Sequence, residues 1–221
     1  WKLLWLSFIS QAGFLCLACV FLLAQMLLAA LWPRMAIVSP DTVGGVVFSS
    51  LFTLSIALTC YKVIEIVLFR RPRHPLPALV SCFLPSMRKL RHMLLGWPVY
   101  TSLVILTYAF NNVKANIPVL QPFSWDQTLD QWDAALHFGR RPWEWLQPLL
   151  GHWPVTFALN LDYNLWFFVM FGVWLHYAFL NPPGVARTRF VLGFMLVWMI
   201  EGGVFAVLFA SAGPCFFGEG R

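Results

Sequence analysis

Residues 190–210 read FVLGFMLVWMIEGGVFAVLFA, and this run decides the class of fold. A membrane-spanning helix needs about 20 mostly apolar residues, and the only charged side chain in this run is Glu201. Similar runs cover residues 3–31, 43–69, 94–110 and 155–179, of which the third is the shortest. The sequence therefore predicts an all-α fold, a polytopic transmembrane helix bundle with about five spans.

The composition points to the same class of protein. Hydrophobic residues make up 60% of the chain and charged residues 11%, whereas an average soluble domain carries about 25% charged residues. The net charge of +6 raises the alternative of a nucleic-acid partner. However, the Lys and Arg residues lie in short loops between apolar runs, which is typical of a membrane protein. We therefore expect membrane lipids, and no nucleic acid, as partners.

Basic residues in two loops predict the orientation in the membrane. The loop between the second and third apolar runs contains Arg70, Arg71, Arg73, Arg88, Lys89 and Arg91. The loop between the fourth and fifth runs contains Arg187 and Arg189. Such residues mark cytoplasmic loops. We therefore expect a multi-pass protein of a bacterial inner (plasma) membrane with a cytoplasmic N-terminus. Residues 111–154 and the end of the fifth run then face the periplasm.

The outer segment, residues 111–154, contains a predicted amphipathic helix. Ser124-Trp125-Asp126-Gln127 fits the S-x-x-Q capping box that starts a helix, and Gly139 suits its C-terminal cap. Two faces recur at helical spacing: Trp125, Leu129, Trp132 and Leu136 on one, and Asp126, Asp130, Asp133 and His137 on the other. This pattern predicts a helix that lies along the outer membrane surface with its apolar face down.

A second short amphipathic helix is predicted directly after the first. Pro142 suits the first turn of a helix, and Trp143, Trp145 and Trp153 suit the headgroup layer of the membrane, where Trp is enriched.

The acidic face has two interpretations. It is a solvated face of an interfacial helix, or it lines a site for a polar headgroup together with the nearby cations Lys114, Arg140 and Arg141. Arg offers a bidentate fork to phosphate, and Lys offers a point charge. Asp130, Asp133 and His137 have a spacing that a metal could use, but acidic helix faces are common and we expect no metal. Asn160, Asp162 and Asn164, in the outer third of the fourth run, face the same side.

Charged residues inside the predicted spans also allow functional and structural interpretations. Lys62 and Glu65 are three residues apart, so we expect them to pair on one helix face. Glu201 lies near the middle of its span, next to Gly202 and Gly203, which would let another backbone approach closely. An intramembrane carboxylate marks a functional site by default. The alternative is a protonated Glu201 that hydrogen-bonds to a neighbouring helix.

No complete catalytic set is present in the chain. There is no G-x-S-x-G, no H-E-x-x-H and no Walker loop. The five histidines do not lie in a P-S-x-H or an H-x-x-x-D. The residues alone therefore predict a polytopic membrane protein with an outward-facing polar site.

Three stretches in this order resemble a known family: FNNVKANIPVLQPFSWDQTLDQWDAALHFGRRPWEWLQPLLG at 110–151, LDYNLWFF at 161–168 and LFASAGPCFFG at 208–218. They are similar to the type-2 phosphatidic acid phosphatase superfamily, and more narrowly to its inositol phosphorylceramide synthase-like branch. The resemblance covers roughly residues 111–218. It implies the first part of a lipid phosphatase or phosphotransferase core over residues 94–221. The apolar runs and the basic loop predict a separate two-helix N-terminal region over residues 1–93, which is not diagnostic of the family.

The resemblance also implies a mechanism. A member of this family cleaves a phosphorylated lipid or headgroup at the outer leaflet through a phospho-histidine intermediate, without a metal or another cofactor. Ser211-Ala212-Gly213-Pro214-Cys215 matches the first family motif, with Pro214 in place but without its Lys and Arg. The catalytic histidine motifs would follow residue 221, so we expect no catalytic residue in this chain. The alternative is a non-catalytic bundle, such as a transporter-like protein or a scaffold.

The expected substrate-binding residues combine the outer segment, the fourth run and the first motif. They are Lys114, Asp133, His137, Arg140, Arg141, Asp162, Ser211, Gly213 and Pro214.

Overall fold

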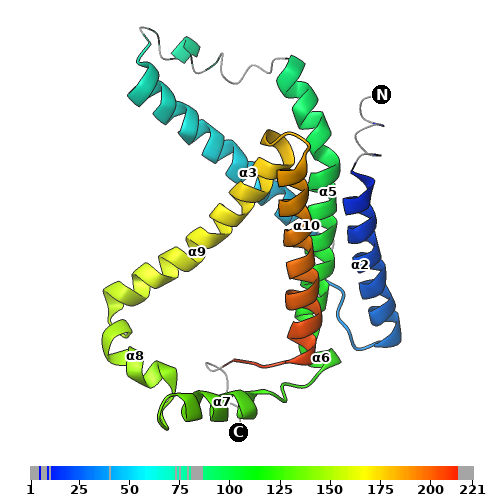
Figure 1. Cartoon of the computed structure of the whole chain (residues 1–221), viewed down its shortest axis with the longest axis vertical. Coiled ribbons are helices and arrows are strands. Elements are labelled where there is room, and N and C mark those ends of the chain that lie inside the picture. The colour runs from blue at the N-terminus through cyan, green and yellow to red at the C-terminus, as the bar shows by residue number, and fades with distance from the viewer. Residues whose placement is uncertain are drawn as a thin grey trace. The chain divides into compact units, whose positions relative to one another are not determined.

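The computed structural model describes residues 5, 9, 11–39, 41–72, 74, 76–78, 80 and 87–213. Over these residues every regular element is a helix and none is a strand (Figure 1), which confirms the all-α prediction. The long helices are α2 (Ala12–Leu31), α3 (Asp41–Ile64), α5 (Met87–Ala115), α9 (Trp153–Leu175) and α10 (Val185–Met199). The short ones are α6 (Ile117–Leu120), α7 (Asp126–Leu136), α8 (Pro142–Leu150) and α11 (Ala206–Leu208).

Three of the long helices continue directly into a π-helix, which the sequence pattern did not predict. These segments are η1 (Glu65–Arg70) after α3, η2 (His176–Leu180) after α9 and η3 (Ile200–Phe205) after α10. A π-helical turn widens the backbone by one residue and is frequent at functional positions.

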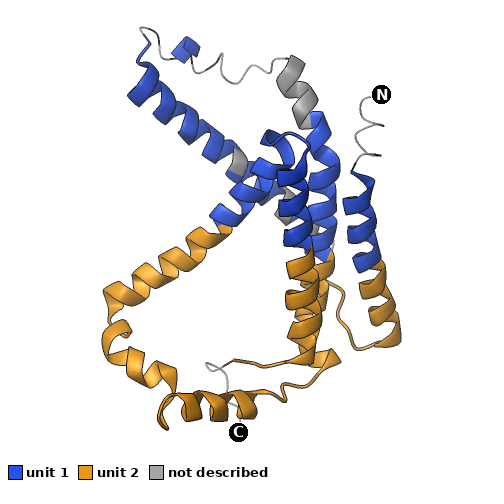
Figure 2. Cartoon of the chain, viewed as in Figure 1, with its two compact units in different colours: residues 1–22, 39–108, 168–195 blue, residues 23–38, 109–167, 196–221 orange. Residues whose placement is uncertain are grey.

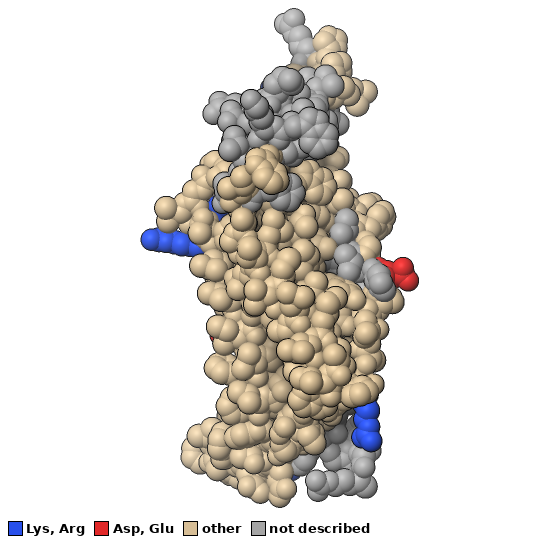
Figure 3. All heavy atoms as spheres, turned by 90° about the vertical axis from the view of Figure 1, so that its right-hand side faces the viewer, with Lys and Arg blue, Asp and Glu red and all other residues tan. Residues whose placement is uncertain are grey.

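Four helical segments are long and apolar enough to cross a membrane, which indicates a membrane protein. They are Ala12–Leu31, Phe48–Arg70, Trp153–Leu180 and Val185–Leu208. At 29 residues α5 is long enough but is not among them, so a count of five spans remains a prediction. Many large apolar side chains on the four segments are exposed, and one face of the molecule carries almost no charged residue among the described atoms (Figure 3).

The chain divides into two compact units that each combine separate stretches of sequence (Figure 2). Unit 1 contains residues 1–22, 39–108 and 168–195, and unit 2 contains residues 23–38, 109–167 and 196–221. The units divide α2, α5, α9 and α10 but not α3. They do not bear on the predicted division of the chain at residue 93.

Unit 1 is built around an aromatic cluster on α5. The Tyr100 ring lies 5.6 Å from the Trp97 ring, 5.5 Å from Phe179 and 5.9 Å from Trp174, centroid to centroid. Its hydroxyl forms a hydrogen bond of 2.7 Å with the Ser50 hydroxyl of α3. Because aromatic pairs add to the effect of area burial, this cluster holds α3, α5 and η2 together.

Arg187 belongs to the packing of unit 1, which corrects its predicted place among loop cations. It lies in the first turn of α10 and is only 2% exposed. Its guanidinium donates to the carbonyl oxygens of Leu95 at 3.1 Å and Asn181 at 3.5 Å. The charge pattern could not distinguish a solvent-facing loop cation from a buried one. In the sequence, a basic residue beside an apolar run looks the same in both cases.

The predicted pair of Lys62 and Glu65 is confirmed. The Lys62 ammonium contacts the Glu65 carboxylate, and Arg70 contacts the other carboxylate oxygen at 2.7 Å. The Glu65 carboxylate is therefore shared by two cations at the end of α3 and in η1, and the group of three keeps a net charge of +1.

In unit 2, Asn112 of α5 and Asn116, the N-cap residue of α6, hold the loop that follows α2. Asn116 accepts from the Ala36 amide and donates to the Ala36 carbonyl, both at 2.8 Å, and Asn112 accepts from the Val38 amide at 2.8 Å. Asn112 and Asn116 are almost fully buried, so these bonds satisfy side-chain amides that would otherwise be costly to bury.

Gly202 allows a close approach in unit 2, but to a side chain rather than to a backbone as expected. A Cβ atom built on Gly202 would lie 2.5 Å from Cε2 of the Phe110 ring. Phe110 also packs on Trp198, with ring centroids 4.5 Å apart. Glu201, in η3, is exposed, and its side chain has no hydrogen-bond or ion-pair partner in the described part of the chain.

Candidate functional site

The amphipathic helix is present as α7, but the predicted capping box is wrong. The helix begins at Asp126 with Trp125 as its N-cap residue, and no side chain caps it. The Ser124 hydroxyl instead accepts a hydrogen bond from the Gln121 side chain at 3.5 Å. The first turn of α7 therefore keeps free backbone amides at its N-terminus.

The other end of α7 follows the prediction more closely. Gly139 has a φ of +83° and its amide donates to the Ala134 carbonyl at 2.7 Å, which closes the helix in the manner of a Schellman motif. Phe138 also has a positive φ, 58°, and its side chain is 94% exposed. The second predicted helix is present as α8, with Pro142 in its first turn.

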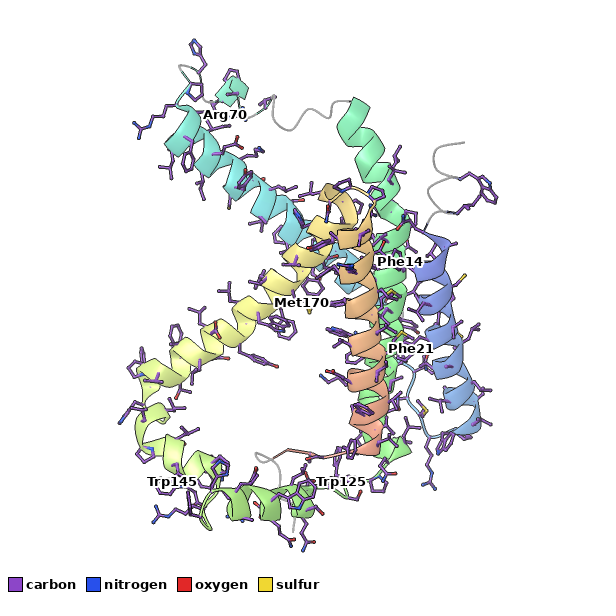
Figure 4. All side chains as sticks on the ribbon, in the orientation of Figure 1. Phe14, Phe21, Arg70, Trp125, Trp145 and Met170 are labelled. Atoms are coloured by element: carbon purple, nitrogen blue, oxygen red, sulfur yellow. The ribbon has the colours of Figure 1, made fainter. Side chains whose placement is uncertain are left out.

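Trp125 joins the start of α7 to the end of the last span (Figure 4). Its indole Nε1 donates to the Leu208 carbonyl at 3.1 Å, and its backbone amide donates to the Ala210 carbonyl at 3.4 Å. Its ring packs edge-on against Phe209, with centroids 5.0 Å apart. Three separate contacts with residues 208–210 therefore fix the position of the Trp125 side chain and backbone.

Asp126 continues this junction with a set of hydrogen bonds that we call the Asp126 latch. Its carboxylate accepts from the Ser211 hydroxyl, from the Ala212 amide at 3.0 Å and from the Gly213 amide at 3.3 Å. The Ser211 oxygen also accepts from the Gly213 amide at 3.1 Å. The latch thus joins two segments that lie 85 to 87 residues apart.

The latch lines a pocket with a volume of about 640 Å³. Its polar lining consists of three carboxylates, one guanidinium, the Ser211 side chain and Gly213, and its apolar lining comes from α7 and α8. The full set is Asp126, Leu129, Asp130, Asp133, Arg141, Pro142, Trp143, Leu146, Ser211 and Gly213. The charged groups sum to 1 − 3 = −2 when all are ionised, so the pocket favours hydrogen-bond donors over free anions.

Arg141, the cation of this pocket, is already paired. Its guanidinium makes a bidentate contact with Asp130, with Nη2 donating to Oδ2 at 3.1 Å, and Nη1 lies 3.6 Å from the Glu144 carboxylate. Asp133, in contrast, has no side-chain partner in the described part of the chain. The unneutralised negative charge of the pocket is therefore shared by Asp133 and by Asp126, whose hydrogen-bond donors are all uncharged.

Two carboxyl groups of the pocket have lowered pKa values. Partial burial alone would raise the pKa of Asp126, but the hydrogen bonds from Ser211, Ala212 and Gly213 outweigh it and lower that pKa. The hydrogen bond from Arg141 lowers the pKa of Asp130, and the same contact raises the pKa of Arg141. Both carboxyl groups therefore remain ionised at neutral pH.

His137 and Arg140 lie beside this pocket, not in it. The His137 Nδ1 atom lies 2.8 Å from the Asp133 carbonyl oxygen, and Arg140 lies over the Trp145 ring at 5.1 Å. His137 and Trp145 line a second, more apolar hollow of about 410 Å³ that shares Pro142 and Leu146 with the first pocket.

The remaining predicted site residues are not brought to the pocket. Lys114 lies near the Phe110 ring at 6.0 Å, and Asp162 is exposed on α9. Pro214 lies outside the described residues. Among those that are described, no group of three His, Cys, Asp or Glu residues could hold a metal ion.

Asp126 is the central residue that the sequence analysis did not select for the site. It was assigned only to the acidic face of α7. The sequence contained one indication of its role. Asp126 and Asp130 are like charges four residues apart on one helix, and they repel each other unless each has its own partner. The structure supplies both partners, Ser211–Gly213 and Arg141.

Comparison of the chain with protein-family models, curated proteins and solved structures found no match.

Proposed function

We propose that this chain is part of an integral membrane lipid phosphatase or phosphotransferase of the type-2 phosphatidic acid phosphatase kind. In this proposal its α7–α8 pocket binds the headgroup of a phosphorylated lipid at the outer leaflet. The observation that carries the proposal is the Asp126 latch, which joins the amphipathic surface helix to the polar end of the last span. The sequence resemblance of both segments to that family supports the choice of chemistry.

The lining of the pocket suits an amphiphilic ligand. Leu129, Trp143 and Leu146 provide apolar contacts beside the carboxylates of Asp130 and Asp133. A carboxylate accepts hydrogen bonds from the hydroxyl or amine groups that lipid headgroups carry. Trp residues favour the layer between water and acyl chains, so a lipid at this depth would reach the pocket without leaving the membrane.

The residues of this chain bind and orient the substrate in the proposal. Asp133 accepts from a headgroup hydroxyl, and Arg141 offers its fork to a phosphoryl oxygen in exchange for Asp130. The phospho-histidine chemistry implied by the family would come from histidines outside these residues, since none of the five histidines has the required sequence context. Orientation of the phosphoryl group is itself a large part of such catalysis.

Phosphate transfer by the complete gene product in proteoliposomes tests the proposal. We expect release of phosphate from phosphatidate, or its transfer to an alcohol acceptor, in the presence of EDTA. Asp133→Asn should raise KM with a smaller effect on kcat, because it removes a headgroup contact that is present before and during the reaction. The matched control is Asp41→Asn, an exposed carboxylate in the first turn of α3. Absence of phosphate transfer, or strict dependence on a divalent ion, would contradict the proposal.

A second candidate is a non-catalytic bundle, which the exposure of Glu201 in η3 favours. A carboxylate within an apolar span is costly and is usually functional. In that case Glu201→Gln should abolish solute uptake or complex formation, while phosphatidate is not cleaved at all. Under the enzyme proposal, Glu201→Gln should leave phosphate transfer within about twofold of the unmodified protein, because Glu201 does not line the pocket.

A further inference from the structure

The Asp126 latch has the geometry of an oxyanion site. Three donors converge on one carboxylate oxygen of Asp126: the Ser211 hydroxyl, the Ala212 amide and the Gly213 amide. The Ala212 amide also reaches the second oxygen, at 3.3 Å. Two successive backbone amides with one residue in the left-handed region form a concavity that binds anions, and Gly213 has a φ of +89°. A Cβ would strain this backbone conformation.

Two of the three donor residues line the pocket, and Ala212 lies between them in the sequence. Ser211 and Gly213 both line the same cavity as Arg141. An anionic group that entered this cavity would meet two amides, a hydroxyl and a guanidinium, which is a typical set of groups around a phosphate. The Asp126 carboxylate therefore stands where an oxygen of such a ligand would bind.

Asp126 has an alternative position for its charge. It occupies the first turn of α7, whose N-terminus has no side-chain cap. The free amides and the positive end of the helix dipole favour a carboxylate there by about 0.3–1 kcal/mol. Release of Asp126 from Ser211–Gly213 would therefore leave the carboxylate at its own helix terminus, and α7 could stay folded.

We propose that Ser211, Ala212 and Gly213 form an oxyanion site for a phosphate group, and that the Asp126 carboxylate is an internal competitor which the phosphate displaces. This inference rests on the proposed function and deepens it, because it assigns the phosphoryl group to backbone amides instead of the missing cations of the first motif. It also explains how a pocket lined by three carboxylates accepts an anion, since one carboxylate leaves the donors as the phosphate arrives.

Phosphate binding to Asp126→Ala tests this directly. The probe is inorganic phosphate, added to the full chain in phosphatidylcholine nanodiscs and measured by calorimetry. We expect Asp126→Ala to bind phosphate at least tenfold more tightly than the unmodified protein, because the competing carboxylate is gone. A second arm with phosphatidate in the nanodiscs separates the sources: occupation by the lipid headgroup should abolish the gain for free phosphate.

Two matched variants separate displacement from a general change in charge. Asp133→Asn removes one negative charge from the same pocket but none of the latch contacts, so it should raise phosphate affinity by less than threefold. Gly213→Ala in the Asp126→Ala background should cancel the gain, because it strains the left-handed residue that presents the amide. Equal gains in Asp126→Ala and Asp133→Asn would overturn the proposal.

Thermal unfolding keeps the test decisive if Asp126→Ala is unstable. A purely structural latch predicts a lower Tm that phosphate does not restore. The proposal predicts that phosphate raises the Tm of Asp126→Ala, and of the isosteric Asp126→Asn, more than that of the unmodified protein. Neither readout needs turnover. A gain in binding without phosphate transfer would therefore reject only the proposed function, and transfer without a gain would reject only this inference.

Discussion

The buried Arg187 of unit 1 and the charged groups of the pocket in unit 2 have opposite surroundings. Unit 1 buries Arg187 at 2% exposure, where two guanidinium nitrogens donate to backbone carbonyls and Nε has no partner among the described atoms. Unit 2 keeps Asp126, Asp130 and Arg141 at the edge of a pocket, where they are partly exposed and paired with each other or with the end of the chain's last span. Buried contacts are costly to break and exposed ones exchange easily. The surroundings of Arg187 therefore have the character of a scaffold, and the pocket of unit 2 has that of a binding region.

Removal of Arg187 should have the largest effect on stability and thus sharpen this comparison most. Arg187→Ala removes the hydrogen bonds to Leu95 and Asn181 and leaves a cavity, so the free energy of unfolding should fall by about 3 kcal/mol. Unfolding in a denaturing detergent titration measures it. Arg189→Ala, an exposed neighbour on the same helix, should change stability by no more than about 0.5 kcal/mol. Equal effects of the two would contradict the scaffold interpretation.

A methyl group at Gly96 should have the next largest effect. A Cβ there would lie 2.4 Å from the Ala178 carbonyl oxygen and 2.5 Å from the Phe179 ring, so Gly96→Ala should destabilise the protein by about 2 kcal/mol. Gly193→Ala on α10 is the control, because nothing lies within 4 Å of its added Cβ. We expect that substitution to be neutral or stabilising by up to about 1 kcal/mol. A tolerated Gly96→Ala would show that α5 and η2 are not in close contact.

Loss of the latch should have a smaller and more local effect, as expected for unit 2. Asp126→Ala should lower stability by about 1 kcal/mol, because three hydrogen bonds to a partly exposed carboxylate are replaced largely by bonds to water. Amide hydrogen exchange at Ala212 and Gly213 should accelerate, while exchange at Leu103 in unit 1 should not change. Acceleration throughout both units would mean that the latch is part of the scaffold.

A fall in pH should weaken the Asp126 latch, and this is the smallest of the expected effects. The folded pKa values of Asp126 and Asp130 lie below their ordinary values. Their stabilisation is therefore complete above about pH 4, the unfolded pKa, and is lost as the pH falls through the lower folded pKa. Exchange at Ala212 and Gly213 should thus accelerate below about pH 4, and Asp126→Asn should remove most of this dependence. A loss of protection that starts near pH 6 would contradict the assignment.

The sequence predicted those features of the fold that depend on local patterns. Runs of apolar residues located the long helices, and the spacing of Trp125, Leu129 and Trp132 located α7. The boundaries were less accurate, since α5 begins at Met87 and α10 at Val185, where basic residues were read as loops. Local patterns also gave the Lys62 and Glu65 pair, because both residues lie on one helix face.

The candidate site was less predictable because its contacts join distant parts of the chain. The capping box failed because Trp125, and not Ser124, is the N-cap residue of α7, and the Ser124 hydroxyl accepts from Gln121 instead. Asp133, Arg141, Ser211 and Gly213 were expected in the site and do share a pocket, whereas Lys114 and Asp162 do not line it. Spacing alone could not rank these cations and carboxylates, since it contains no information on which of them already have partners.

Accessibility of Leu129, which lines the pocket, tests the central claim that this pocket is an outward-facing site for a phosphorylated lipid. Leu129→Cys would be introduced into a variant without the five native cysteines, and labelled in intact cells with a membrane-impermeant maleimide. The account predicts labelling without permeabilisation, at a rate that added short-chain phosphatidate lowers severalfold while phosphatidylcholine of equal chain length does not. Labelling only after permeabilisation, or equal protection by both lipids, would contradict it.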